Sequence, residues 1–144
     1  MQKPILLYRI LLEFLPQILE EGNLKGGEMG DFFHDWMVSY LKRKLGRDYK
    51  EVKANTGEER HEFRGHYPDL ILGSYGMVVA LVEVETEETI TPEQAERWKE
   101  LASLGPKLII MVPAHTKAKV ADLLWKTGLG AKASVGTYEI VVKM

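Results

Sequence analysis

Hydrophobic positions between residues 67 and 88 predict a β-hairpin in the middle of the chain. A short apolar run begins with Pro68 and Asp69 and meets a Gly-Ser-Tyr-Gly turn, and a longer apolar run leaves that turn. In the second strand successive side chains face opposite sides, and both sides are apolar until Glu83. We therefore expect a strand that is buried on both faces and ends in carboxylates, which are costly to bury unless they are paired, hydrated or bound to a cation.

The pattern before the hairpin predicts two helices and an edge strand. Residues 4–21 carry a broad apolar stripe that a fully solvated helix would not have, so part of this N-terminal helix should be covered. Residues 31–45 repeat apolar side chains at helical spacing, with basic residues in the last turn and Gly46 as the cap. Residues 49–54 alternate weakly and indicate an edge strand, and the polar residues 55–66 indicate a loop.

The pattern after the hairpin predicts alternating helices and strands. Thr91, Pro92 and Gln94 form a capping box with proline at the first helical position, which indicates a helix from there to about residue 104. A buried strand, a helix and a closing strand follow at residues 107–112, 114–127 and 135–142. Strands that alternate with helices imply parallel crossovers, so we expect an α/β fold with a mixed sheet flanked by helices.

Length and composition indicate one domain. With 144 residues and 45% apolar content, the chain can bury a core without a partner. We divide residues 1–144 into a helical extension (1–22), a core (25–112) and a C-terminal helix and strand (113–144). The absence of cysteine excludes disulfides and thiolate metal sites and is consistent with the cytoplasm. Arg9 and Glu13 interrupt the N-terminal apolar run, so we expect neither a signal peptide nor a membrane anchor.

Charge is distributed unevenly along the chain. The formal net charge is -2, but residues 107–144 hold six lysines against Asp122 and Glu139, so residues 1–106 carry the acidic excess. This balance disfavours a protein that binds nucleic acid over its whole surface. A local basic wall facing an acidic site is still compatible with it.

The acidic residues of the hairpin are the main candidates for chemistry. Glu83 and Glu85 lie two residues apart on one strand, and Asp69 begins its neighbour. Three converging carboxylates repel one another unless a divalent cation compensates their charge. Oxygen ligands without cysteine favour Mg²⁺ or Mn²⁺, which suits hydrolysis of phosphodiesters.

The simplest hairpin does not bring these residues together. If residues 73–76 formed a symmetric four-residue turn, Asp69 would face Ala80, three positions short of Glu83. We therefore predict a bulge, a longer loop or a bend at Pro68.

The spacing of these residues resembles the PD-(D/E)XK nuclease signature. Pro68-Asp69 is followed by Glu83-Val84-Glu85 after fourteen residues, and the predicted elements occur in the order of that superfamily's restriction-endonuclease-like core. That core has a helix, a three-stranded meander, a crossover helix and a further strand, which here would span roughly residues 25–112. The resemblance implies a nuclease that uses Mg²⁺ or Mn²⁺.

The same resemblance implies roles for individual residues. Asp69 and Glu83 would be metal ligands, together with the carbonyl of Val84 and the side chain of Glu28 near the start of the first core helix. Glu85 would occupy the catalytic position at which most members have a lysine, and some members have glutamate there. Gln94, four residues before Trp98, resembles the Gln-x-x-x-Tyr element of the RecB-like branch and would contact the water or the scissile strand.

The polar loop offers residues that could contact phosphates. Arg60, Arg64 and His66 are the candidates for binding nucleic acid. The alternative is a solvated loop, because three glutamates between residues 58 and 62 offset the positive charge.

Three functions are compatible with the sequence. The first is a metal-dependent endonuclease whose partner is nucleic acid, with DNA favoured over RNA. The second is a catalytically inactive nuclease-fold module that binds protein or nucleic acid, and the N-terminal helix could then support a homodimer. The third, a small-molecule hydrolase that uses Glu83 and Glu85, lacks any sugar-binding or cofactor motif, and no glycine-rich phosphate loop is present.

Overall fold

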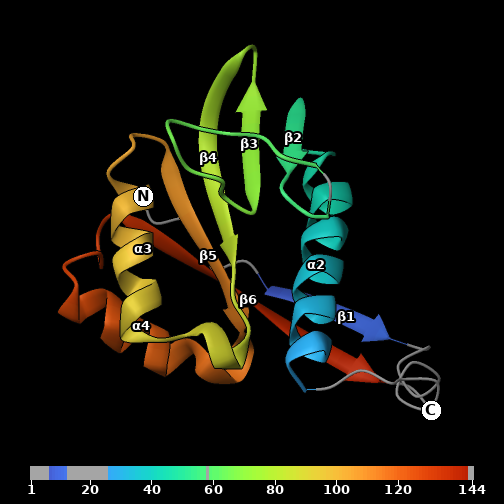
Figure 1. Cartoon of the computed structure of the whole chain (residues 1–144), viewed down its shortest axis with the longest axis vertical. Helices are drawn as coiled ribbons and strands as arrows, with labels where there is room; N and C mark the ends of the chain where they lie inside the picture. Colours follow the sequence, from blue (N-terminus) through green and yellow to red (C-terminus); the bar gives the residue numbers. More distant parts are fainter. Residues whose placement is uncertain (1–6, 13–25, 58, 143–144) are drawn as a thin grey trace.

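A six-stranded mixed β-sheet forms the centre of the described part of the chain in a computed structural model (Figure 1). The structure describes residues 7–12, 26–57 and 59–142, and it describes side chains for residues 32–57 and 59–141. The strand order is β1-β6-β5-β4-β3-β2. The strands are β1 (Leu7–Leu12), β2 (Glu51–Ala54), β3 (Leu70–Ser74), β4 (Met77–Val84), β5 (Lys107–Pro113) and β6 (Ala133–Val142). The helices are α2 (Gly26–Leu45), α3 (Pro92–Ala102) and α4 (Lys117–Lys126), with 3₁₀ turns at Glu87–Thr89 and Ala114–Thr116.

Helices cover both faces of the sheet and create two apolar cores. Helix α2 lies on one side of the sheet, and α3 and α4 lie on the other (Figure 1). The α2 core contains Val82 and Val84 from β4, whereas Leu81 of the same strand belongs to the α3 and α4 core. The central strands are therefore buried on both faces, which explains their nearly continuous apolar sequences.

Local sequence signals explain where the two core helices lie. Helix α3 begins as predicted, because the Thr91 hydroxyl accepts a hydrogen bond from the backbone N–H of Gln94 at 3.1 Å and Pro92 follows the cap. Helix α2 has basic residues in its last turn, as predicted. Its buried side chains recur at spacings of three or four residues: Met37, Val38, Leu41 and Leu45.

The order of elements confirms an α/β fold with a mixed sheet. Helix α2 precedes the antiparallel meander β2-β3-β4, and α3 then connects β4 to the parallel strand β5. Helix α4 and strand β6 extend the sheet with a second parallel pair, β5 and β6. The predicted edge strand, polar loop and C-terminal helix and strand are all present.

The hairpin contains the predicted irregularity. The turn is centred on Tyr75 and Gly76, which both have positive φ, and Met77 pairs with Ser74. In the symmetric four-residue turn Met77 would pair with Leu72, so the observed turn shifts the register by two positions. Val79 is then an extra residue, because Gly73 pairs with Val78 whereas Leu72 pairs with Ala80, and this bulge adds the third position. One position beyond the pair of Leu70 and Val82, the backbone N–H of Asp69 donates to Oε1 of Glu83, so this register brings the two acidic residues together.

The prediction of a helix over residues 4–21 is wrong for residues 7–12. These residues form β1, which pairs in parallel with β6 from Leu7 opposite Thr137 to Leu12 opposite Val142. A short apolar run cannot be assigned to helix or strand from periodicity alone, and the free edge of β6 supplies hydrogen-bond partners for a strand. The rest of the predicted helix lies outside the described residues. The suggested homodimer contact through an N-terminal helix is therefore not supported at residues 7–12, which form a strand. No helix in the described ranges is long and apolar enough to span a membrane.

Replacing Gly76 with alanine should destabilise the protein by about 1 kcal/mol, because its φ of 77° is costly for a residue with a Cβ atom. Gly130 is a suitable control, since its φ is not in the left-handed region and no atom lies within 4 Å of a Cβ built there. Urea unfolding of Gly76→Ala and Gly130→Ala would measure both changes. An equal loss in both variants would contradict the argument.

Candidate functional site

Asp69 and Glu83 meet where β3 begins and β4 ends. The backbone N–H of Asp69 donates to Oε1 of Glu83 at 3.2 Å, and the backbone N–H of Val84 donates to Oδ2 of Asp69 at 2.7 Å. The Glu83 residue is only 2% exposed. The hairpin register therefore holds two acidic side chains close together where the otherwise apolar strands β3 and β4 begin and end.

Helix α2 supplies a basic partner to Asp69. Nε2 of His34 lies 3.1 Å from Oδ2 of Asp69, and Nδ1 lies 3.0 Å from Oδ1 of Asp35. The His34 side chain is only 26% exposed. His34 lies four residues before Val38 and seven before Leu41, which places it on the buried face of the helix.

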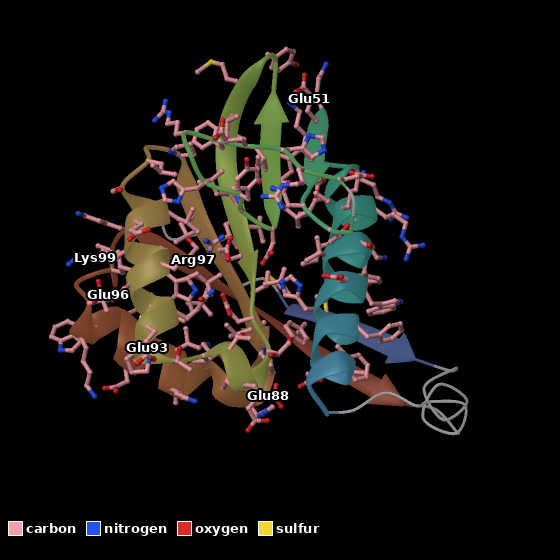
Figure 2. All side chains as sticks on the ribbon, viewed as in Figure 1. Glu51, Glu88, Glu93, Glu96, Arg97 and Lys99 are labelled. Carbon is pink, nitrogen blue, oxygen red and sulfur yellow. The ribbon has the colours of Figure 1, made fainter. Side chains whose placement is uncertain are left out.

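Helix α3 supplies a basic partner to Glu83 from the other side of the sheet. The guanidinium of Arg97 lies 3.4 Å from each carboxylate oxygen of Glu83, and it also donates to the carbonyl of Tyr67 at 3.1 Å. Figure 2 shows Arg97 on the side of α3 that faces the hairpin, whereas Glu96 and Lys99 lie on the opposite side. The two acidic residues thus have a basic side chain from each helical layer.

Burial dominates the electrostatics of this cluster. Burial and then the charge of Asp69 raise the pKa of Glu83 to about 8, although Arg97 acts in the opposite direction. Burial would lower the pKa of His34, but the hydrogen bond and charge of Asp69 outweigh it and raise this pKa to about 9. Burial likewise opposes the protonation of Arg97, and the charge of Glu83 outweighs that effect and raises its pKa.

Glu85 occupies a separate polar niche behind this pair. Its Oε1 accepts hydrogen bonds from Nε2 of Gln94 at 2.7 Å and from Nε1 of Trp98 at 3.0 Å, and its Oε2 accepts from the Thr89 hydroxyl at 2.5 Å. The residue is 1% exposed, and burial raises its pKa while these three donors lower it. Because Gln94 and Trp98 are four residues apart on α3, both reach the same oxygen.

The backbone of Glu85 connects the site to the rest of the sheet. Its N–H donates to the carbonyl of Met111 in β5 at 2.8 Å, and its carbonyl accepts from the Tyr138 hydroxyl of β6 at 2.6 Å. Burial and the charge of Glu85 raise the pKa of Tyr138, so this phenol stays a donor. Strands β5 and β6 therefore position the end of β4.

The predicted metal ligands are only partly assembled. Among the described side chains, no group of three or more His, Cys, Asp and Glu could hold a metal ion. Asp69 and Glu83 lie together, and Val84 contacts Asp69 through its N–H, whereas the group predicted as a ligand is its carbonyl. Glu28 lies in the first turn of α2, but its side chain is outside the described residues. The metal site therefore stays a prediction.

The predicted nucleic-acid loop is largely occupied by internal contacts. The Arg64 guanidinium donates to the carbonyl of Leu104, and Arg60 lies over the ring of Tyr67 at 4.3 Å. His66 exchanges backbone hydrogen bonds with Phe63 at 2.8 and 3.0 Å. These contacts hold the loop against α3 and the start of β3, and a role in binding phosphates stays a prediction.

Sequence reasoning missed four residues of the site: His34, Thr89, Arg97 and Tyr138. Two of them had a usable signal. His34 is in register with the apolar stripe of α2, and Arg97 is three residues after Gln94, on nearly the same face of α3. The contacts of Thr89 and Tyr138 depend on the turn after β4 and on the position of β6, and no local pattern indicates them.

Comparisons of the chain with protein-family models, with curated proteins and with solved structures find no match.

The site should make the protein less stable in alkaline solution. A pKa of His34 above its ordinary value of 6.5 gives stability that is complete below pH 6.5 and lost as the pH rises towards 9. Glu83 acts in the same direction between about pH 4.5 and 8, because the folded protein holds a proton that the unfolded chain releases.

The free energy of unfolding in urea should fall between pH 6 and pH 9. This fall should be smaller for His34→Gln than for wild type, by on the order of 1 kcal/mol after allowing for solvent screening. His115→Gln, at an exposed histidine paired with Glu87, should leave the difference unchanged. Identical profiles for wild type and His34→Gln would contradict the assignment.

Proposed function

We propose that the protein is a metal-dependent phosphodiesterase that cleaves nucleic acid at the Asp69 and Glu83 edge. The observation that carries this proposal is the hairpin register, which places two carboxyl groups opposite each other although they repel. In this sequence, the turn at Tyr75 and Gly76 and the bulge at Val79 together produce this register. The sequence resemblance to the PD-(D/E)XK nucleases and the meander followed by a parallel crossover support the same function.

The donor set suits a hard divalent cation. Asp69 and Glu83 offer oxygen atoms without competing sulfur ligands, and Mg²⁺ and Mn²⁺ prefer such oxygens. Burial and then the charge of Asp69 raise the pKa of Glu83 although Arg97 lowers it, and a divalent cation would favour its ionised form. A bound Mg²⁺ or Mn²⁺ would polarise a phosphate and lower the pKa of a water molecule.

The protein groups around the pair would hold it in a fixed orientation. The N–H of Val84 and the imidazole of His34 both contact Oδ2 of Asp69, and the N–H of Asp69 contacts Oε1 of Glu83. Such contacts fix the direction of each carboxylate before a ligand arrives. Glu85 then acts mainly as a positioning residue in this proposal, because three donors of the 3₁₀ turn Glu87–Thr89 and of α3 already bind its carboxylate.

Arg97 is suited to bind the substrate. Its side chain is 38% exposed, so it can reach solvent as well as Glu83, and a guanidinium forms paired hydrogen bonds with phosphate oxygens. We assign it two alternative partners: Glu83 when no cation is present, and a substrate phosphate when a cation binds Glu83.

A second candidate function is a binding module without turnover. The saturated niche of Glu85 and the protein cations beside Asp69 and Glu83 favour it, because the buried charges already have protein partners. Metal titration and cleavage assays separate these two functions.

Calorimetric titration of Mn²⁺ should give saturable binding to wild type and no resolvable binding to Glu83→Gln, which keeps the shape of the side chain and removes its charge. At a free concentration of one hundred times Kd, wild type should gain about 2.7 kcal/mol of stability. Wild type should also cleave single-stranded or plasmid DNA with Mn²⁺ or Mg²⁺, and the variant should not.

The matched control for this titration is Glu93→Gln, since Glu93 is an exposed glutamate at the start of α3 (Figure 2). It should bind Mn²⁺ as wild type does. Equal binding by wild type and Glu83→Gln would overturn the metal site, whereas normal binding without cleavage of any substrate would favour the binding module.

Arg97→Gln should bind Mn²⁺ about tenfold more tightly than wild type at pH 8.5 and should cleave nucleic acid more slowly. The affinity should rise because the cation no longer competes with a guanidinium for Glu83, and two unit charges about 4 Å apart repel each other by about 1 kcal/mol even in bulk water. Lys99→Gln removes the same charge from the outer side of α3 and should change neither property. Weaker metal binding by Arg97→Gln would refute this role.

A further inference from the structure

The outer face of α2 contains a hollow that belongs to none of the groups described above. Its volume is about 600 Å³, which is within the range of ligand-binding clefts. It lies on the side of the helix opposite His34 and the buried stripe. Its lining residues are Trp36, Ser39, Lys42, Arg43, Gly46 and Arg47, and we call it the α2 groove.

The α2 groove is basic although the protein as a whole is slightly acidic. Three of its six lining residues are cations and none is acidic. Residues 36–50 contain five basic residues and one acidic residue in a chain with a net charge of -2. Lys42 pairs with Glu59 at 3.6 Å, but no carboxylate in the described part of the chain pairs with Arg43 or Arg47. Both arginines are exposed.

The groove also presents a fixed aromatic plane. The ring of Trp36 stacks on Tyr40 with 5.5 Å between centroids and 21° between planes, and the amino group of Lys44 lies 5.5 Å from the Tyr40 ring centre. This ladder follows the helix at spacings of four residues. Basic residues in a last turn are explained by the helix dipole, but the dipole does not require a tryptophan two turns earlier.

We infer that the α2 groove binds a segment of single-stranded nucleic acid, with a base stacked on Trp36 and phosphates bound by Arg43 and Arg47. Aromatic planes next to guanidinium groups are the combination that single-strand binders use, since every unpaired base offers a flat face and every link carries a negative charge. A duplex keeps its bases stacked inside and would use only the charges. Nucleic acid as the occupant rests on the proposed function.

The position of the groove would help to present a strand to the carboxylates. Helix α2 carries His34 on its inner face and the groove on its outer face, and residues 34 and 43 are separated by about 14 Å along the helix axis. Lys42 also connects the groove to the loop of residues 55–66 through Glu59. Residues 67 and 68 then connect that loop to Asp69.

The test is fluorescence anisotropy with a labelled oligo(dT) in EDTA, where a metal-dependent enzyme cannot cleave. Wild type should bind in a salt-dependent way. Arg43→Gln/Arg47→Gln should weaken binding at least tenfold and reduce the slope of log K against log salt by about 1.4, since each single-strand phosphate contact contributes about 0.7. Trp36→Leu keeps apolar packing but removes the plane and should weaken binding between about fivefold and a hundredfold.

The control is Lys117→Gln/Lys119→Gln, which removes two exposed cations from α4 and should change binding less than twofold. Melting curves would show that all variants fold. Absence of binding by wild type, an equal loss in the α4 control, or equal affinity for duplex DNA, heparin or a phosphopeptide would overturn the inference. Wild type that binds oligo(dT) in EDTA but neither binds Mn²⁺ nor cleaves would refute the metal site alone, so failure of the metal site and failure of the groove are distinguishable.

Discussion

Two carboxyl groups meet at the edge of the sheet, and the apolar cores on both sides prevent water from solvating them fully. The protein meets this cost with backbone N–H groups and with one basic side chain from each helical layer. His34 and Arg97 therefore connect α2 and α3 through the ends of β3 and β4. This arrangement of charges therefore links both helices, the end of the hairpin and the chemistry of the site.

Glu85 shows how the same strand combines two kinds of acidic side chain. Glu83 faces the partly exposed guanidinium of Arg97, whereas Glu85 faces three neutral donors in a closed niche. A buried carboxylate with several good hydrogen bonds can stay charged without a counter-ion. This division leaves Glu83 available for exchange between partners and makes Glu85 an anchor for the chain between β4 and α3.

Much of the fold follows from the sequence because its signals are local. Apolar runs, the Thr91 cap and the basic end of α2 depend on neighbours within a few residues, so these elements were predicted at nearly their observed positions. Residues 7–12 were assigned wrongly because strand formation there depends on β6, more than one hundred residues away. The meeting of Asp69 and Glu83 was predicted from their types and order. His34 and Arg97 were missed as their partners, because those contacts depend on how α2 and α3 pack against the sheet.

Val79 is the one residue of β4 between Met77 and Val82 that has no partner in β3. The pairs on either side of the bulge are regular, so a homologous chain that lacked this residue could keep every remaining pair and still align its two acidic positions. Every residue of β3 is paired, so the loss of one of them would break a pair. The side chain of Asp69 would then move to the opposite face of the sheet. Loss of the bulge residue from β4 should therefore be tolerated, whereas loss of a residue from β3 should disrupt the register.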